Sequence, residues 1–81
     1  MQVRVRLGAG LARLAAAPLH SIELEDGATV ADACRRLAAE RPELEGALDA
    51  ALPVVAGAHA ERGQPLRHGD ELALLTPVAS G

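Results

Sequence analysis

Residues 29–41 have the sequence Thr-Val-Ala-Asp-Ala-Cys-Arg-Arg-Leu-Ala-Ala-Glu-Arg and predict the clearest helix of the chain. Thr29 can begin the helix by accepting a hydrogen bond from the third helical amide, and Asp32 adds negative charge to the first turn. Pro42 ends the helix, because a residue that precedes proline is displaced from the helical region. Apolar residues recur at helical spacing and give the helix one core-facing side. They are Val30, Ala33, Cys34, Leu37 and Ala38.

Two strand patterns precede this helix. Residues 2–7, Gln-Val-Arg-Val-Arg-Leu, alternate polar and apolar side chains, which is typical of a strand with one buried face. Residues 20–24 show the same alternation and predict a second strand. Between them, residues 11–17 favour a helix by residue propensity but could also form a loop before Pro18.

Shorter elements follow the helix. Residues 43–52 predict a second, shorter helical segment, and residues 53–56 and 58–60 predict two short strands. Residues 71–75, Glu-Leu-Ala-Leu-Leu, predict the last strand. This order indicates an α+β fold, in which a mixed sheet carries one main helix packed across one face. The residues expected to be largely buried are Val3, Val5, Leu7, Ile22, Leu24, Val30, Leu37, Leu72 and Leu74.

The composition excludes several classes of function. The 81 residues allow one domain, and because no residue is aromatic the core must consist of Leu, Val, Ile and Ala. Such a core lacks the bulky walls of an enclosed ligand pocket, so an enzyme with its own active site is disfavoured. The formal net charge is −3, and the eight arginines are scattered without a basic stripe. Nucleic-acid binding is therefore disfavoured as well.

Cysteine and histidine add no obvious reactive site. The single Cys34 excludes an internal disulfide and lies on the apolar side of the predicted helix, where an inert core residue is the better interpretation. His20, His59 and His68 lack the spacing of metal ligands. The sequence shows neither a signal peptide nor an apolar run long enough to span a membrane. We therefore expect a cytoplasmic protein without a metal site or membrane contact.

Four stretches occur in the order seen in a known protein family. Residues 3–7 resemble the family's first strand, and residues 26–30 resemble its entry into the main helix. Residues 66–75 resemble its last turn and strand, followed by a proline-containing tail at residues 76–81. The chain thus resembles the ubiquitin-like sulfur carriers of the MoaD/ThiS family, above all the small subunit of molybdopterin synthase. The resemblance implies a β-grasp domain at residues 1–75 and an extended, flexible tail.

The residue types of the tail suit a reactive chain end. Gly81 has no Cβ, so its carbonyl carbon can be attacked with little crowding. Pro77 has a fixed φ and no backbone N–H, so it resists joining a sheet or helix. Val78 offers an apolar anchor, whereas Ala79 and Ser80 are small, Ser80 standing where the family usually has glycine. Composition alone favours an ordinary frayed terminus, and the functional interpretation depends on the resemblance.

The resemblance implies chemistry at the Gly81 carboxylate. A ubiquitin-activating-type enzyme would adenylate this carboxylate with ATP, and a sulfur-donor enzyme would supply the sulfur of a thiocarboxylate. The large subunit of molybdopterin synthase would then use that sulfur in molybdenum cofactor synthesis. The chain would be a protein cosubstrate or non-catalytic subunit, and it would bind no cofactor itself. The residues expected to contact partners are Leu75, Pro77, Val78, Ala79 and Ser80.

Three alternatives stay open at this point. The chain could carry sulfur for thiazole, cysteine or tRNA thiolation instead of molybdopterin. It could be a protein modifier, in which the activated Gly81 forms an amide with a lysine of a target protein. It could also be a plain interaction module whose tail is never activated. A thiocarboxylate on the intact protein separates the carriers from the interaction module, and a branched peptide ending in Gly81 identifies the modifier.

Overall fold

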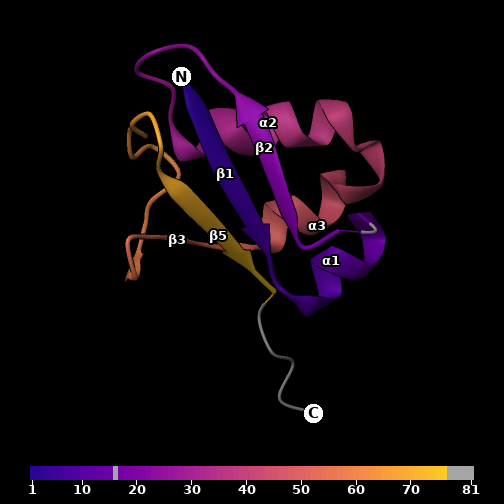
Figure 1. Cartoon of the computed structure of the whole chain (residues 1–81). Coiled ribbons are helices and arrows are strands. Elements are labelled where there is room, and N and C mark those ends of the chain that lie inside the picture. Colours follow the sequence, from indigo (N-terminus) through magenta and orange to yellow (C-terminus); the bar gives the residue numbers. More distant parts are fainter. Residues whose placement is uncertain (16, 77–81) are drawn as a thin grey trace.

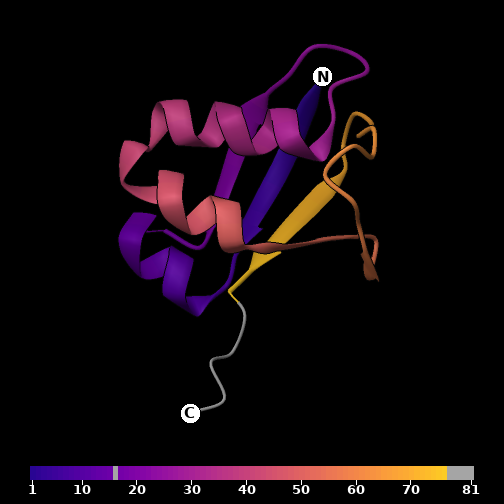
Figure 2. The ribbon, with the colours of Figure 1, turned by 180° about the vertical axis from the view of Figure 1, so that it is seen from behind.

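The fold has two layers, a five-stranded sheet and a set of helices that covers one of its faces (Figures 1 and 2). The computed structural model describes residues 1–15 and 17–76. The elements in chain order are β1 (Gln2–Leu7), α1 (Ala9–Ala15), β2 (Leu19–Glu23), α2 (Val30–Glu40), a 3-10 turn η1 (Pro42–Leu44), α3 (Glu45–Ala50), β3 (Leu52–Val55), β4 (Ala58–His59) and β5 (Glu71–Leu75). The predicted α+β architecture, a mixed sheet with one main helix across a face, is confirmed.

The first and last strands of the chain lie side by side at the centre of the sheet. The strand order is β2-β1-β5-β3-β4, with β1 and β5 parallel and all other pairs antiparallel. Val5 stands opposite Leu72, and Leu7 stands opposite Leu74. Because both neighbours of β5 are hydrogen-bonded strands, β5 is fixed on the β1 side as far as Leu74 and on the β3 side as far as Leu75.

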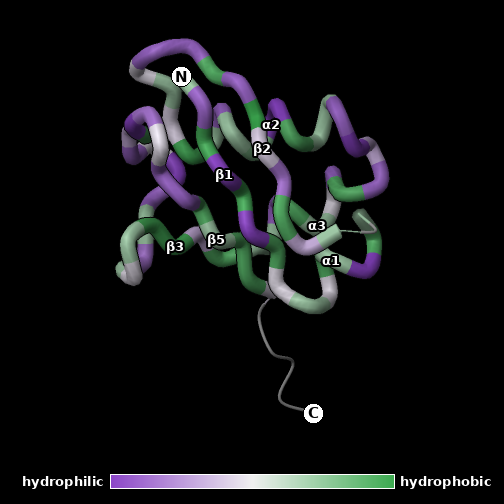
Figure 3. The backbone as a smooth tube through the Cα atoms, in the orientation of Figure 1, coloured by the Kyte–Doolittle hydropathy of each residue, from purple (hydrophilic) through white to green (hydrophobic). Residues whose placement is uncertain are grey.

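The core lies between the sheet and the helices. Polar and apolar residues alternate along β1, visible as alternating colours in Figure 3, and its three apolar residues are buried. Of the nine residues predicted to be largely buried, only Leu24 is half-buried. The reason is its place: β2 is an edge strand that ends at Glu23, so Leu24 packs on the rim of the core.

The main helix begins and ends as predicted. Thr29 accepts a hydrogen bond from the Asp32 amide at 3.3 Å, and Asp32 accepts one from the Thr29 amide at 2.9 Å, which forms a reciprocal capping box. Arg41 is the C-cap residue, just before Pro42. The predicted helical segment 43–52 proves to be η1 followed by α3, which ends at Ala50, so that Leu52 already belongs to β3. Of the ambiguous segment 11–17, residues 11–15 are helical and belong to α1, which begins at Ala9.

One arginine, Arg62, connects the end of α3 to the loop between β4 and β5. The Nη2 atom of Arg62 donates to the carbonyl oxygens of Leu48, Asp49 and Ala51 at 2.7, 3.1 and 3.2 Å. These carbonyls belong to the last turn of α3, where a helix leaves acceptors unsatisfied and carries partial negative charge. Arg62 therefore caps α3 from a distant part of the sequence.

Candidate functional site

The tail that is predicted to carry the reactive group follows β5 in the sequence. Leu75, the last residue of β5, is 42% exposed, and Thr76 is the last residue that the structure describes. The other predicted site residues lie outside the described part of the chain, so their roles stay predictions. These residues are Pro77, Val78, Ala79, Ser80 and Gly81.

The face of the sheet opposite the helices carries a continuous apolar surface beside Leu75. Leu75 stands opposite Leu52 of β3, which is 44% exposed, and Ala73 stands opposite Val54. The side chains of all four point away from the core, because Leu72, Leu74 and Pro53 between them are buried. We call Leu52, Val54, Ala73 and Leu75 the outer-face patch.

Charged side chains border the outer-face patch on β1. Arg6 stands opposite Ala73 and forms an ion pair with Glu71, with 3.2 Å between Nη2 and Oε1. The hydrogen bond from Arg6 holds the pKa of the Glu71 carboxyl below its usual range, with Arg4 adding a smaller effect. Both partners keep exposed surface. An apolar centre with a charged rim has the composition of a protein docking surface.

The sequence predicts Leu75 as a partner contact, and the alternation along residues 71–75 puts Ala73 on the same face, but it does not place Leu52 and Val54 beside them. The β3–β5 pairing that brings Leu52 and Val54 beside it joins positions far apart in the chain. The only local signal was the apolar run Leu52, Pro53 and Val54, in which no polar residue marks the outward-facing side chains. The predicted strand also began one residue too late to include Leu52.

The first turn of α1 lies against the same end of β5. The Gly8 amide donates to the Leu74 carbonyl at 2.9 Å, which extends the β1–β5 pairing by one bond. The next residues turn into α1 beside Leu75 and Thr76. The point at which the tail leaves is therefore flanked by the outer-face patch and by the start of α1.

Cys34 has the environment of a structural residue. Its side chain is part of the core, and burial raises the pKa of the thiol, with the nearby Arg62 guanidinium, 3.5 Å from Sγ, opposing the effect. A raised pKa keeps the thiol protonated and poorly nucleophilic. In the described residues, no group of three His, Cys, Asp or Glu side chains is placed to hold a metal ion.

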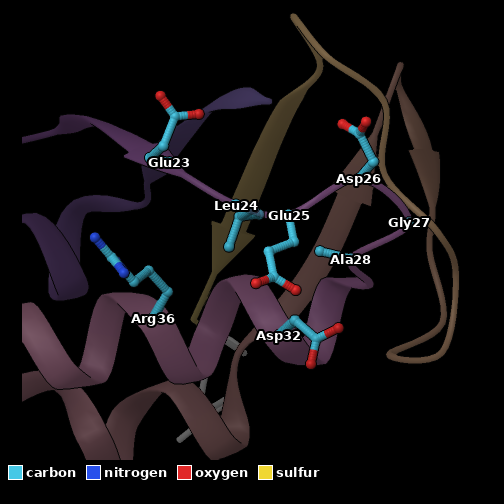
Figure 4. Close-up of a pocket in the computed structure, with 8 residues that line it drawn as sticks. All are labelled: Glu23, Leu24, Glu25, Asp26, Gly27, Ala28, Asp32 and Arg36. Atoms are coloured by element: carbon cyan, nitrogen blue, oxygen red, sulfur yellow. The ribbon is translucent and has the colours of Figure 1, made fainter.

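A shallow acidic depression lies between the β2–α2 loop and α2 (Figure 4). Its volume is about 650 Å³, and Leu24 and Ala28 contribute apolar lining. Three of its acids have structural partners: Glu23 and Asp26 lie 3.2 and 4.0 Å from the N-terminal amine, and Asp32 belongs to the capping box. We assign these three acids to the stability of the loop and of α2.

None of the helices formed by residues 1–15 and 17–76 is both long and apolar enough to cross a membrane. Near Thr76 the described residues present an apolar surface with a charged rim.

Comparisons with known proteins agree with this geometry. Residues 5–81 match the model of the ThiS family. SAMP1 from Haloferax volcanii has a TM-score of 0.92 and 30% identity, with 100% of both chains covered. A putative molybdopterin converting factor subunit 1 from Pyrococcus furiosus has a TM-score of 0.85 and 23% identity, covering 96% of this chain and 99% of the other.

A third similar structure comes from a complex. A chain from the complex of subunits 1 and 2 of the molybdopterin-converting factor of Helicobacter pylori has a TM-score of 0.72 and 22% identity, with 100% of both chains covered. At such identities, the Pyrococcus and Helicobacter structures show a shared fold alone. No curated protein sequence matches this chain.

Proposed function

We propose that this chain, which belongs to the ThiS family, carries sulfur as a thiocarboxylate on Gly81. Membership makes it a small ubiquitin-like protein of the sulfur-carrier and modifier type. The observation that carries the finer proposal is the exit of the tail. The last strand is paired with β1 as far as Leu74 and with β3 as far as Leu75, so the residues after Thr76 follow a strand that is fixed in the sheet beside the outer-face patch.

The proposed chemistry needs an external activating enzyme. An α-carboxylate is anionic at pH 7 and is therefore a poor acyl donor. In the first step a carboxylate oxygen attacks the α-phosphorus of ATP and pyrophosphate leaves. A sulfur nucleophile then attacks the carbonyl carbon and displaces AMP. ATP is used by the partner, and this chain needs no cofactor of its own.

We assign the sulfur to molybdopterin synthesis as the leading pathway. The likeness to molybdopterin converting factor subunit 1 supports this choice, and the Helicobacter complex supports a large-subunit partner. Thiazole, cysteine and tRNA thiolation are the alternatives within the carrier class. We place the reaction in the cytoplasm, where ATP is supplied and Cys34 stays reduced.

Protein modification is the second candidate function. It is favoured by one observation: the structure that matches along its whole length at 30% identity is named a small archaeal modifier protein in a second determination. In that case a lysine amine of a target would displace AMP and form an amide with Gly81. A branched peptide ending in Gly81, found by mass spectrometry of cellular proteins, would identify this function.

The test of the carrier function uses the full chain and its cognate activating enzyme. With ATP and a sulfur source, the intact mass should rise by the exchange of one oxygen for sulfur, and fragmentation should place the change on Gly81. Deletion of Gly81 should abolish sulfur transfer without loss of folding, because the residue lies beyond β5. Ser80→Gly should be activated at least as well as the wild type, because it removes bulk beside the reacting carbonyl. Equal sulfur transfer by the Gly81 deletion would refute the assignment of the sulfur to Gly81, and a wild type that forms no thiocarboxylate would favour a plain interaction module.

A further inference from the structure

Two arginines of β1 lie on the sheet face opposite the helices, with apolar side chains on both sides of them. The strand β1 lies between β2 and β5 (Figure 1). Arg6 stands opposite Ala73 of the outer-face patch and, on its other side, opposite Leu19 of β2, which is 43% exposed. Arg4 comes two residues earlier in the strand, so its side chain points to the same face. A partner that covers both the outer-face patch and Leu19 therefore also covers Arg6 and comes up against Arg4.

The two carboxylates that the strands present on this face are both paired. Glu71 forms its ion pair with Arg6, and Glu23 lies 3.2 Å from the N-terminal amine. Arg4 stands opposite Glu71, but within the described part of the chain its guanidinium forms no ion pair of its own. The chain has a formal net charge of −3, yet this face is left with a positive charge that has no partner.

The unpaired charge restricts which partner surface can dock here. A guanidinium that loses its water without gaining a hydrogen-bonding partner destabilises a complex, whereas a carboxylate can bind it through two parallel hydrogen bonds. We propose that the activating enzyme docks on the outer-face patch with an apolar surface that carries an acidic group, and that Arg4 binds this carboxylate. This inference deepens the proposed function and rests on it, because the activating enzyme is the occupant to which it commits.

The ion pair beside Arg4 gives the two arginines different roles. Arg6 donates from Nε and Nη2 to the two carboxylate oxygens of Glu71, at 3.4 and 3.2 Å, so its guanidinium is already engaged within the sheet. This pairing also neutralises Glu71, which would otherwise repel an approaching acidic group. Removing the charge of Glu71 would leave two unpaired arginines and should strengthen the attraction of an acidic partner. The effect of Glu71 on binding therefore reports the sign of the partner's charge.

The experiment measures the Kd of the full chain for its cognate activating enzyme by calorimetry, at about 0.05 and 0.5 M NaCl. Arg4→Gln should raise the Kd about tenfold or more at low salt, and its Kd should change less with salt than that of the wild type. Arg41→Gln is the matched control, because Arg41 is an exposed arginine at the end of α2, on the opposite layer of the fold. It removes the same charge and should leave the Kd within about twofold of the wild-type value. Circular dichroism should show that both variants are folded.

A further variant tests the sign of the partner's charge. Glu71→Gln loses one exposed ion pair and should stay folded, and it should lower the Kd about two- to fivefold at low salt. Three results would each overturn the inference while the carrier function stands: a wild-type Kd for Arg4→Gln, an equal loss of affinity in Arg41→Gln, or binding of Glu71→Gln no tighter than that of the wild type. A wild-type protein that the enzyme does not adenylate would overturn the proposed function, and this inference with it.

Discussion

Replacing Arg62 by methionine is expected to destabilise the domain by about 2 kcal/mol, because the side chain caps α3 from another part of the sequence. Its Nη2 atom carries two hydrogens, so it can serve two of the three nearby carbonyls fully at one time. A hydrogen bond from a charged donor contributes about 1.5–3 kcal/mol. Two terms reduce the sum: the Asp49 carbonyl is open to water, and the Leu48 carbonyl keeps the Ala51 amide at 3.3 Å.

Urea unfolding followed by circular dichroism measures this loss. For a domain of this size the slope m is about 1 kcal/mol per M, so the midpoint should fall by about 2 M with m unchanged. Arg62→Lys should retain part of the stability, since one ammonium group can still donate to a carbonyl. The exposed Arg67, changed to methionine, is the control and should have almost no effect. A loss below about 0.5 kcal/mol for Arg62→Met would refute the assignment of a distant cap.

Four further outcomes are expected. Leu37→Ala should cost about 2–5 kcal/mol in the same assay, because Leu37 is 1% exposed in the core; a smaller loss would contradict that placement. Ala56→Asn should stabilise the folded domain by about 0.5–1 kcal/mol, because Ala56 has φ +53° in a two-residue hairpin turn that favours Asn before Gly. An unchanged urea midpoint would argue against backbone strain at Ala56. The hydrogen bond from the Thr29 backbone amide lowers the pKa of the Asp32 carboxyl, so this bond stabilises the fold above the unfolded-state pKa and is lost as the pH falls through the folded-state pKa. The stability difference between the wild type and Asp32→Asn should therefore vanish in acid. A difference that does not change with pH would contradict this role of the carboxylate. Leu75→Asp should weaken binding to the activating enzyme at least about tenfold in calorimetry, whereas Leu14→Asp should not, because Leu14 is a similarly exposed leucine on α1, outside the outer-face patch. Equal affinities of the wild type and Leu75→Asp would remove Leu75 from the docking surface.

The elements predicted from sequence are those whose signals are local. The helix α2 has its cap, its apolar period and its stop within a few residues, from Thr29 to Pro42, and both ends were predicted correctly. The alternation in residues 2–7 likewise identifies which side chains of β1 are buried. Such signals depend on neighbours in the chain, which a single sequence contains in full.

The features that were missed depend on contacts between distant parts of the chain. No sequence pattern around Arg62 predicts that its guanidinium donates hydrogen bonds to the end of α3. Leu52 joins the outer-face patch only through its pairing with Leu75. The family resemblance predicts a reactive chain end, whereas the surroundings of β5 from which that end continues required the fold.

Because β1 and β5 are neighbours in the sheet, the domain cannot complete its fold until the ribosome has synthesised β5. Pairing strands from opposite ends of a sequence is slow, since a long loop must close before the contact forms. A chain truncated before Glu71 leaves β1 and β3 with open edges, which invites aggregation or degradation. A partner that recognised the assembled sheet would therefore meet only chains whose synthesis has passed Leu75.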